Sequence, residues 1–175
     1  KAVNSASDNI WYLQNLATIY QSEEKYDSTL SVYKQLNKLE PENVNIMYAL
    51  AGLCETLARN QEAIQWLDEI DQRIGHSREV SVSKFRIYEK LSEPEKAIES
   101  LKNAASGEEE DDYNILGMIA EFYRNQGKLD SAARYYNLIF PEYNADPLVT
   151  FSYAGYLMDI GDRDSARNLI IEMIK

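Results

Sequence analysis

Hydrophobic residues in the stretch from Leu116 to Ile139 form two helical stripes with a polar break between them. Apolar residues stand at positions 116, 119, 120 and 123, and again at 132, 136 and 139. Steps of three and four place side chains on one face of an α-helix. Between the stripes lies Gly127, which can adopt the left-handed conformation that ends a helix. The pattern therefore predicts a helical hairpin whose two helices cross at small residues.

The same hairpin pattern recurs along the chain with a period of about 34 residues. The last large residue of the first stripe recurs at Tyr20, Cys54, Tyr88, Tyr123 and Leu157. A small residue of the second stripe recurs in phase at Thr29, Ala63, Ala97, Ala132 and Ala166. The repeat predicts a tail over residues 1–9 and then five helix-turn-helix units. Their approximate ranges are 10–43, 44–77, 78–112, 113–146 and 147–175.

With this period and these positions, the chain resembles the tetratricopeptide repeat family. The family consensus carries Leu-Gly-x-x-Tyr in the first helix of each repeat and Ala-x-x-x-Phe in the second. The resemblance covers nearly the whole chain. It implies an all-α fold, an α-solenoid of about ten antiparallel helices in helix-turn-helix repeats that wind into a right-handed superhelix. It also implies a single array over residues 10–175.

The third unit departs from the family pattern. Phe85 occupies a position that is Ala or Gly in the family, and Lys84 occupies the preceding Leu position. A side chain as large as Phe should push the paired helices apart, so we expect local distortion between residues 80 and 91. The second helix of this unit carries Ser92-x-x-Glu95, which fits a capping box that satisfies two backbone N–H groups.

Charge and hydropathy narrow the classes of partner. The chain has 29 acidic and 18 basic residues and a net charge of −11, which argues against binding nucleic acid or an anionic membrane surface. No apolar run approaches the roughly 20 residues that span a bilayer, so we expect a soluble protein. The chain starts at Lys1 rather than Met, which indicates a trimmed N-terminus and leaves both a cytoplasmic and an exported location open.

Candidate chemistry is sparse, and the sequence predicts no enzyme, cofactor or metal site. His76, the only histidine, lies in a turn without the third group that a catalytic triad requires. Cys54 stands at a core position of the repeat, where a free cysteine behaves as a small hydrophobe. The acidic run at residues 108–112 lacks the spacing and the glycine of a calcium loop, and it is better explained as a solvated helix start.

The resemblance implies that the first helices line a concave groove. The matching positions are Trp11, Gln14, Thr18, Tyr48, Gly52, Glu79, Val82, Arg86, Gly117, Glu121, Arg124 and Phe151. From these we take as candidate partner-binding residues Trp11, Gln14, Tyr48, Glu79, Arg86, Glu121, Arg124 and Phe151. One subgroup of the family grips a terminal carboxylate with Lys, Asn and Arg. The positions that would carry this clamp hold Gln14, Thr18, Ala49, Glu79 and Ser83, so the clamp is absent from these units.

The leading functional hypothesis is a non-enzymatic scaffold that binds a peptide or helix of a partner protein in the concave groove, as part of a larger repeat protein. The alternative is an architectural spacer or oligomerisation domain within a larger assembly. The last helix carries Leu169, Ile170, Ile171, Met173 and Ile174, and these cannot all face its own partner helix. We therefore expect the native chain to continue beyond Lys175 with a further helix or repeat, and the 175-residue form either to self-associate through this helix or to fray there.

Overall fold

The computed structural model describes residues 9–105 and 113–174, which form ten helices and, in those ranges, no strand. The helices are α1 (Ile10–Ser22), α2 (Tyr26–Leu39), α3 (Val44–Thr56), α4 (Asn60–Ile74), α5 (Arg78–Lys90), α6 (Pro94–Ala105), α7 (Tyr113–Asn125), α8 (Leu129–Tyr143), α9 (Pro147–Asp159) and α10 (Arg163–Met173). The predicted all-α fold is confirmed. Most of the predicted tail and the acidic run at residues 108–112 lie outside the described residues. No described helix is long and apolar enough to cross a membrane.

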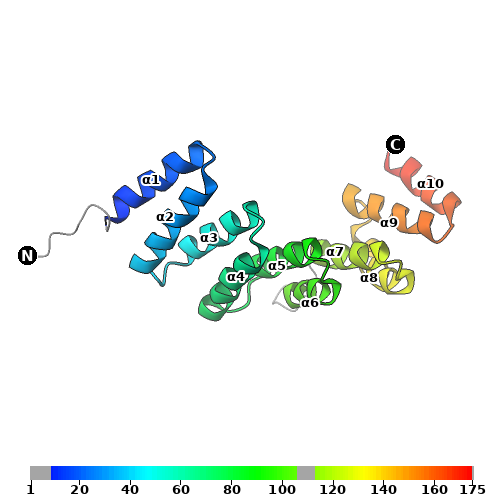
Figure 1. Ribbon diagram of the computed structural model, residues 1–175. Helices are drawn as coiled ribbons and strands as arrows, with labels where there is room; N and C mark the ends of the chain where they lie inside the picture. The colour runs from blue at the N-terminus through cyan, green and yellow to red at the C-terminus, as the bar shows by residue number, and fades with distance from the viewer. Residues whose placement is uncertain (1–8, 106–112, 175) are drawn as a thin grey trace, which may run out of the picture. The chain divides into compact units, whose positions relative to one another are not determined.

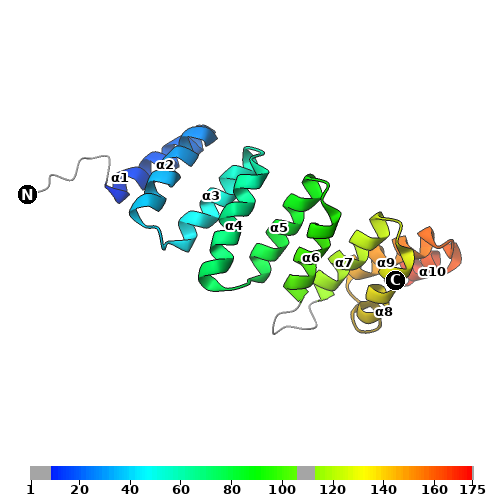
Figure 2. The same ribbon diagram turned by 60° about the horizontal axis from the view of Figure 1, so that its bottom comes forward.

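The helices gather into two compact units, residues 1–97 and residues 98–175. In the first unit, each helix from α1 to α4 packs against the next one along the chain (Figure 2). The core of this unit is built from the predicted apolar faces and includes Leu13, Ala17, Leu30, Leu36, Met47, Leu50, Cys54, Ala63, Leu67 and Ile70. That the repeats form one array over residues 10–175 stays a prediction.

In the second unit, α7 packs against α8, α8 against α9 and α9 against α10 (Figure 1). In addition, α7 contacts α9, so the first helices of two successive repeats lie side by side. Ala132, Tyr136 and Ile139 of α8 are almost completely buried, as the spacing of apolar residues predicts. This packing brings one face of α7 next to one face of α9, and the candidate site lies there.

The turn inside each repeat has the same hydrogen-bond pattern in all five repeats. A residue with positive φ ends each first helix, at Glu24, Ala58, Ser92, Gly127 and Gly161. The backbone N–H of the next residue donates to the carbonyl of the last large residue in the stripe of the first helix. Examples are the bonds from Lys25 to Tyr20 at 2.8 Å and from Lys128 to Tyr123 at 2.9 Å. This is the Schellman motif, which satisfies carbonyls at a helix end. From the sequence, this motif can be predicted only where glycine occupies the positive-φ position, at Gly127 and Gly161.

One prediction for the third unit is wrong, and another stays a prediction. Helix α5 is unbroken over 13 residues, as long as α1 and α3, and Phe85 is buried with 6% exposure, while the expected separation of the paired helices by Phe85 stays a prediction. The predicted capping box is wrong. Ser92 has φ 57°, which is a helix-ending conformation, and α6 begins only at Pro94.

Lys84, the second departure in this unit, lies in an ion-pair cluster. Its ammonium group contacts Oδ1 of Asp68 at 2.7 Å and Oδ2 of Asp71 at 2.5 Å, both on α4. The side chains of Lys84 and Asp71 are only 14% and 9% exposed. The ion pair between Lys84 and Asp71 therefore replaces the apolar contact that leucine makes at this position in the family. His76 lies 3.5 Å from the same Asp71 carboxylate and is exposed to solvent.

Candidate functional site

A pocket of about 410 Å³ lies between α7 and α9 in the second unit. We call it the Gly117 pocket, and its lining consists of Tyr113, Asn114, Gly117, Met118, Glu121, Ile139, Leu148, Val149 and Ser152. Gly117 leaves this space open, since a Cβ there would contact only Ile139 Cδ1, at 3.9 Å. Ile139 and Val149 are buried, whereas Leu148 is 78% exposed. The pocket therefore combines an apolar interior with an accessible apolar rim.

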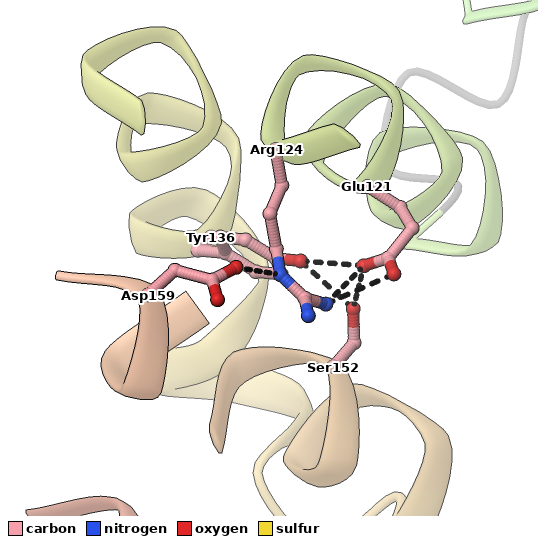
Figure 3. A network of polar contacts seen from close by, with 5 residues as sticks. All are labelled: Glu121, Arg124, Tyr136, Ser152 and Asp159. Carbon is pink, nitrogen blue, oxygen red and sulfur yellow. Dashed lines mark hydrogen bonds and ion pairs between the residues drawn. The ribbon is translucent and has the colours of Figure 1, made fainter. Parts of the chain in front are cut away.

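A polar network joins the pocket lining to α8 and to the end of α9 (Figure 3). Its centre is the carboxylate of Glu121, whose Oε2 accepts from Tyr136 Oη at 2.8 Å and from Ser152 Oγ at 2.7 Å. Arg124 donates to Oε1 of Glu121 at 2.9 Å and, through Nε, to Asp159 Oδ2 at 2.6 Å. Residues from three helices are thereby held together, and Glu121 and Ser152 also line the pocket.

Burial and charge set the electrostatics of this network. Burial, reinforced by the carboxylate of Glu121, raises the pKa of Tyr136 to about 12, so its phenol stays protonated and donates. Burial alone would lower the pKa of Arg124, but the hydrogen bond with Asp159 and the charge of Glu121 outweigh it and raise that pKa. Arg124 therefore remains charged, and two carboxylates against one guanidinium leave the network with a net charge of −1.

The hydroxyl groups of Tyr136 and Ser152 both donate to the carboxylate of Glu121, so this arrangement holds side chains from three helices in fixed positions. Within residues 9–105 and 113–174, no cluster of three or more His, Cys, Asp or Glu side chains is arranged to hold a metal ion. Burial raises the pKa of the Cys54 thiol to about 11, which keeps it protonated and unreactive near neutral pH.

Five of the predicted partner-binding residues lie in the first unit. Trp11 is 64% exposed and packs edge-on against Tyr12, with ring centroids 5.2 Å apart. Tyr48 is half-buried against the core of that unit. The remaining three, all exposed, are Gln14, Glu79 and Arg86.

The other three predicted residues lie in the second unit. Glu121 and Arg124 contact each other directly, and Glu121 lines the Gly117 pocket. Phe151 is 53% exposed and lines a different pocket, of about 430 Å³, between α9 and α10. The structure thus brings Glu121 and Arg124 together and places Phe151 apart from them.

Sequence reasoning missed three members of the network. The repeat position of Tyr136 predicts a core residue, and its ring is buried. Its hydroxyl, however, also donates a hydrogen bond to Glu121. Ser152 and Asp159 were not singled out. The repeat spacing could have identified Asp159 as a partner of Arg124. The two residues are 35 positions apart in the sequence, as are Glu55 and Lys90, which also form an ion pair between successive repeats.

Comparisons with known proteins agree with this fold. MamA from Desulfovibrio magneticus RS-1 superposes with a TM-score of 0.73 at 11% identity, over 97% of this chain and 94% of that one. YrrB, described as a TPR protein with an unusual peptide-binding site, gives 0.65 at 15% identity, over 99% and 89% of the two chains. A tetratricopeptide repeat protein from Parabacteroides merdae ATCC 43184 gives 0.71 at 18% identity, over 99% and 67%. Identities this low establish the fold alone.

The sequence comparisons identify the family. Curated proteins give no match to this chain. Profiles described as tetratricopeptide repeat match residues 20–81 and 83–147, which together make up more than half of the chain. These ranges contain the helix pairs α3–α4 and α7–α8 in full, and the resemblance inferred from the 34-residue period is confirmed. The chain belongs to the tetratricopeptide repeat family.

Proposed function

We propose that this protein is a non-enzymatic interaction module that binds a peptide or helix of a partner protein across the first helices of its repeats. The Gly117 pocket carries this proposal. It lies between α7 and α9, has an apolar interior, and is bordered by a fixed polar network. Binding pockets in proteins have this composition, with mostly apolar walls and a few placed polar groups.

Two further observations support this proposal. The protein belongs to a family of interaction scaffolds, and the structurally similar YrrB is described as having a peptide-binding site. Helix α9 also exposes large apolar side chains, since Leu148 at the rim of the Gly117 pocket and Phe151 and Met158 at the pocket between α9 and α10 are each at least 50% exposed. Exposed apolar surface of this kind is typical of interaction sites. In the first unit, taken by itself, the exposed polar residues Gln14, Glu79 and Arg86 are the candidates for contact with a partner.

A panning experiment tests the proposal. A display library of random peptides, each about twelve residues long and so able to reach across more than one repeat, is selected on the immobilised chain. We expect enriched peptides that bind the purified chain and that bind more weakly after Arg124→Ala, which removes the partner of Glu121, or Leu148→Ala at the pocket rim. If no peptide is enriched over an uncoated support, the proposal is wrong, and the architectural spacer becomes the better explanation.

A further inference from the structure

The Gly117 pocket runs along α7, and its length limits what can occupy it. Its lining begins at Tyr113 and ends at Glu121, which is about 12 Å along a helix axis. An extended segment rises about 3.3 Å per residue, so roughly three or four residues of a ligand lie over the pocket. One anchoring side chain with a neighbour on each side fills that length.

The interior of the pocket selects an apolar anchor. Ile139 is 1% and Val149 is 6% exposed, and both present aliphatic side chains to the space above Gly117. The hydroxyl of Ser152 is already committed to Glu121. A polar side chain placed against the aliphatic wall of Ile139 and Val149 would lose its hydration without gaining a hydrogen bond from that wall. A large aliphatic side chain or Phe would instead bury its surface against these residues and against the exposed rim at Leu148.

Charge at the two ends of the pocket selects what flanks the anchor. At one end, Glu121 and Asp159 share the single guanidinium of Arg124, which leaves a net charge of −1. At the other end, Tyr113 donates to the carboxylate of Asp146 at 3.4 Å. Because carboxylates border both ends, basic groups on the ligand are attracted and acidic groups are repelled.

We infer that the Gly117 pocket holds one large apolar side chain of a partner segment, with lysine or arginine residues on either side of that anchor. This inference rests on the proposed function and narrows it to a class of ligand.

Panning with counter-selection tests this inference. Peptides are selected on the wild-type chain after depletion on Gly117→Leu, whose added side chain fills the pocket. We expect the surviving peptides to share Leu, Ile, Met or Phe with Lys or Arg within about two positions of it. The strongest peptide is then made in three forms, as selected, with the anchor changed to Ala, and with the flanking basic residues changed to Glu. Fluorescence anisotropy at low salt should show that each change weakens binding about 10-fold or more.

Matched variants separate a filled pocket from a damaged fold. Gly117→Leu should melt no lower than wild type, because Leu is a better helix former than Gly. Gly52→Leu, which adds the same side chain to α3 where nothing lies within 4 Å of its Cβ, should leave binding unchanged. If Gly117→Leu does not fold, Leu148→Lys replaces it, since that side chain is 78% exposed and should tolerate the change.

The inference is overturned if the Ala-anchored or Glu-flanked peptide binds as well as the parent, or if the pocket variant binds as tightly as wild type. Peptide binding itself would then stand, with a different ligand class. An empty selection on the wild-type chain would remove both the inference and the proposed function.

Discussion

The guanidinium group of Arg124 rests on the backbone of Gly155, and a Cβ at Gly155 would lie only 2.8 Å from Nη1 of Arg124. Glycine at this point of α9 is what allows Arg124 to reach across from α7 to Asp159. Gly155 therefore matters for this contact between repeats, because a side chain there would occupy the space of Arg124, and not for the conformation of α9. The same guanidinium orders Glu121, which lines the Gly117 pocket, so Gly155 and the pocket are linked through one side chain.

Gly155→Ala should uncouple Arg124 from Asp159 without unfolding the protein. The displaced group is the end of a flexible side chain, and Ala favours a helix over Gly by about 1 kcal/mol, so overall stability should change little. The coupling free energy between Arg124→Ala and Asp159→Ala, measured by urea denaturation, should be about 1 kcal/mol in the native background and less than half of that in the Gly155→Ala background. Gly52→Ala is the control, and an unchanged coupling would contradict this interpretation.

Lys84→Leu restores the residue type that the family carries, yet it should destabilise this protein. Asp71 would lose its ammonium partner while its carboxylate stays buried, which typically costs about 3–5 kcal/mol. Lys84→Leu combined with Asp71→Leu should recover most of that loss, because neither charge then remains. Lys25→Ala, which breaks an exposed pair with Glu23, should change the free energy of unfolding far less. Chemical denaturation measures all three, and equal losses in the single and double Lys84 variants would contradict this account.

The repeated turn predicts opposite effects for two substitutions. Ala58 has φ 55° and Gly127 has φ 69°, at the same point of their repeats. A side chain in the left-handed conformation costs about 1–2 kcal/mol. Ala58→Gly should therefore raise the free energy of unfolding by up to about 1 kcal/mol, and Gly127→Ala should lower it by about as much. Thermal melts would decide, and effects of the same sign would mean that the two turns are not equivalent.

Stability should fall at alkaline pH because of Cys54. In the unfolded chain the thiol ionises near pH 9, whereas in the folded state burial and the nearby Glu62 carboxylate raise its pKa to about 11. Between these values the unfolded state releases the proton and the folded state retains it, so stability declines as pH rises through this window. Urea midpoints at several pH values, compared with Cys54→Ala, isolate the effect. The variant should show a shallower decline, and identical slopes would exclude this origin.

Self-association through the C-terminal helix is a further expectation. Ile171 and Ile174 are 40% and 73% exposed, next to the apolar pocket that Phe151 lines. Contiguous apolar surface of this kind favours association. Sedimentation should show concentration-dependent association that Ile174→Glu weakens, whereas Ile19→Glu, at a similarly exposed isoleucine of α1, should not. A monomer at all concentrations would count against this role for α10.

The helix pairs and their buried faces could be predicted from the sequence, because apolar periodicity is a local property of each helix. Ala63, Ala97 and Ala132 are completely buried where the repeat places them. Gly127 and Gly161 were readable as helix ends, since glycine tolerates positive φ. Glu24, Ala58 and Ser92 adopt the same conformation although nothing local favours it. There, the packing of the two helices imposes the turn.

The contacts between polar groups of different helices could not be predicted from the sequence. Lys84 was visible as a departure from the family pattern, but its partner Asp71 lies on the preceding helix. Ser152 reaches a carboxylate 31 residues earlier in the chain, and Arg124 reaches one 35 residues later. These contacts, and the pocket above Gly117, depend on how closely α9 packs against α7. That distance is set by the combined volume of the side chains between the helices, which no periodicity within a single helix encodes.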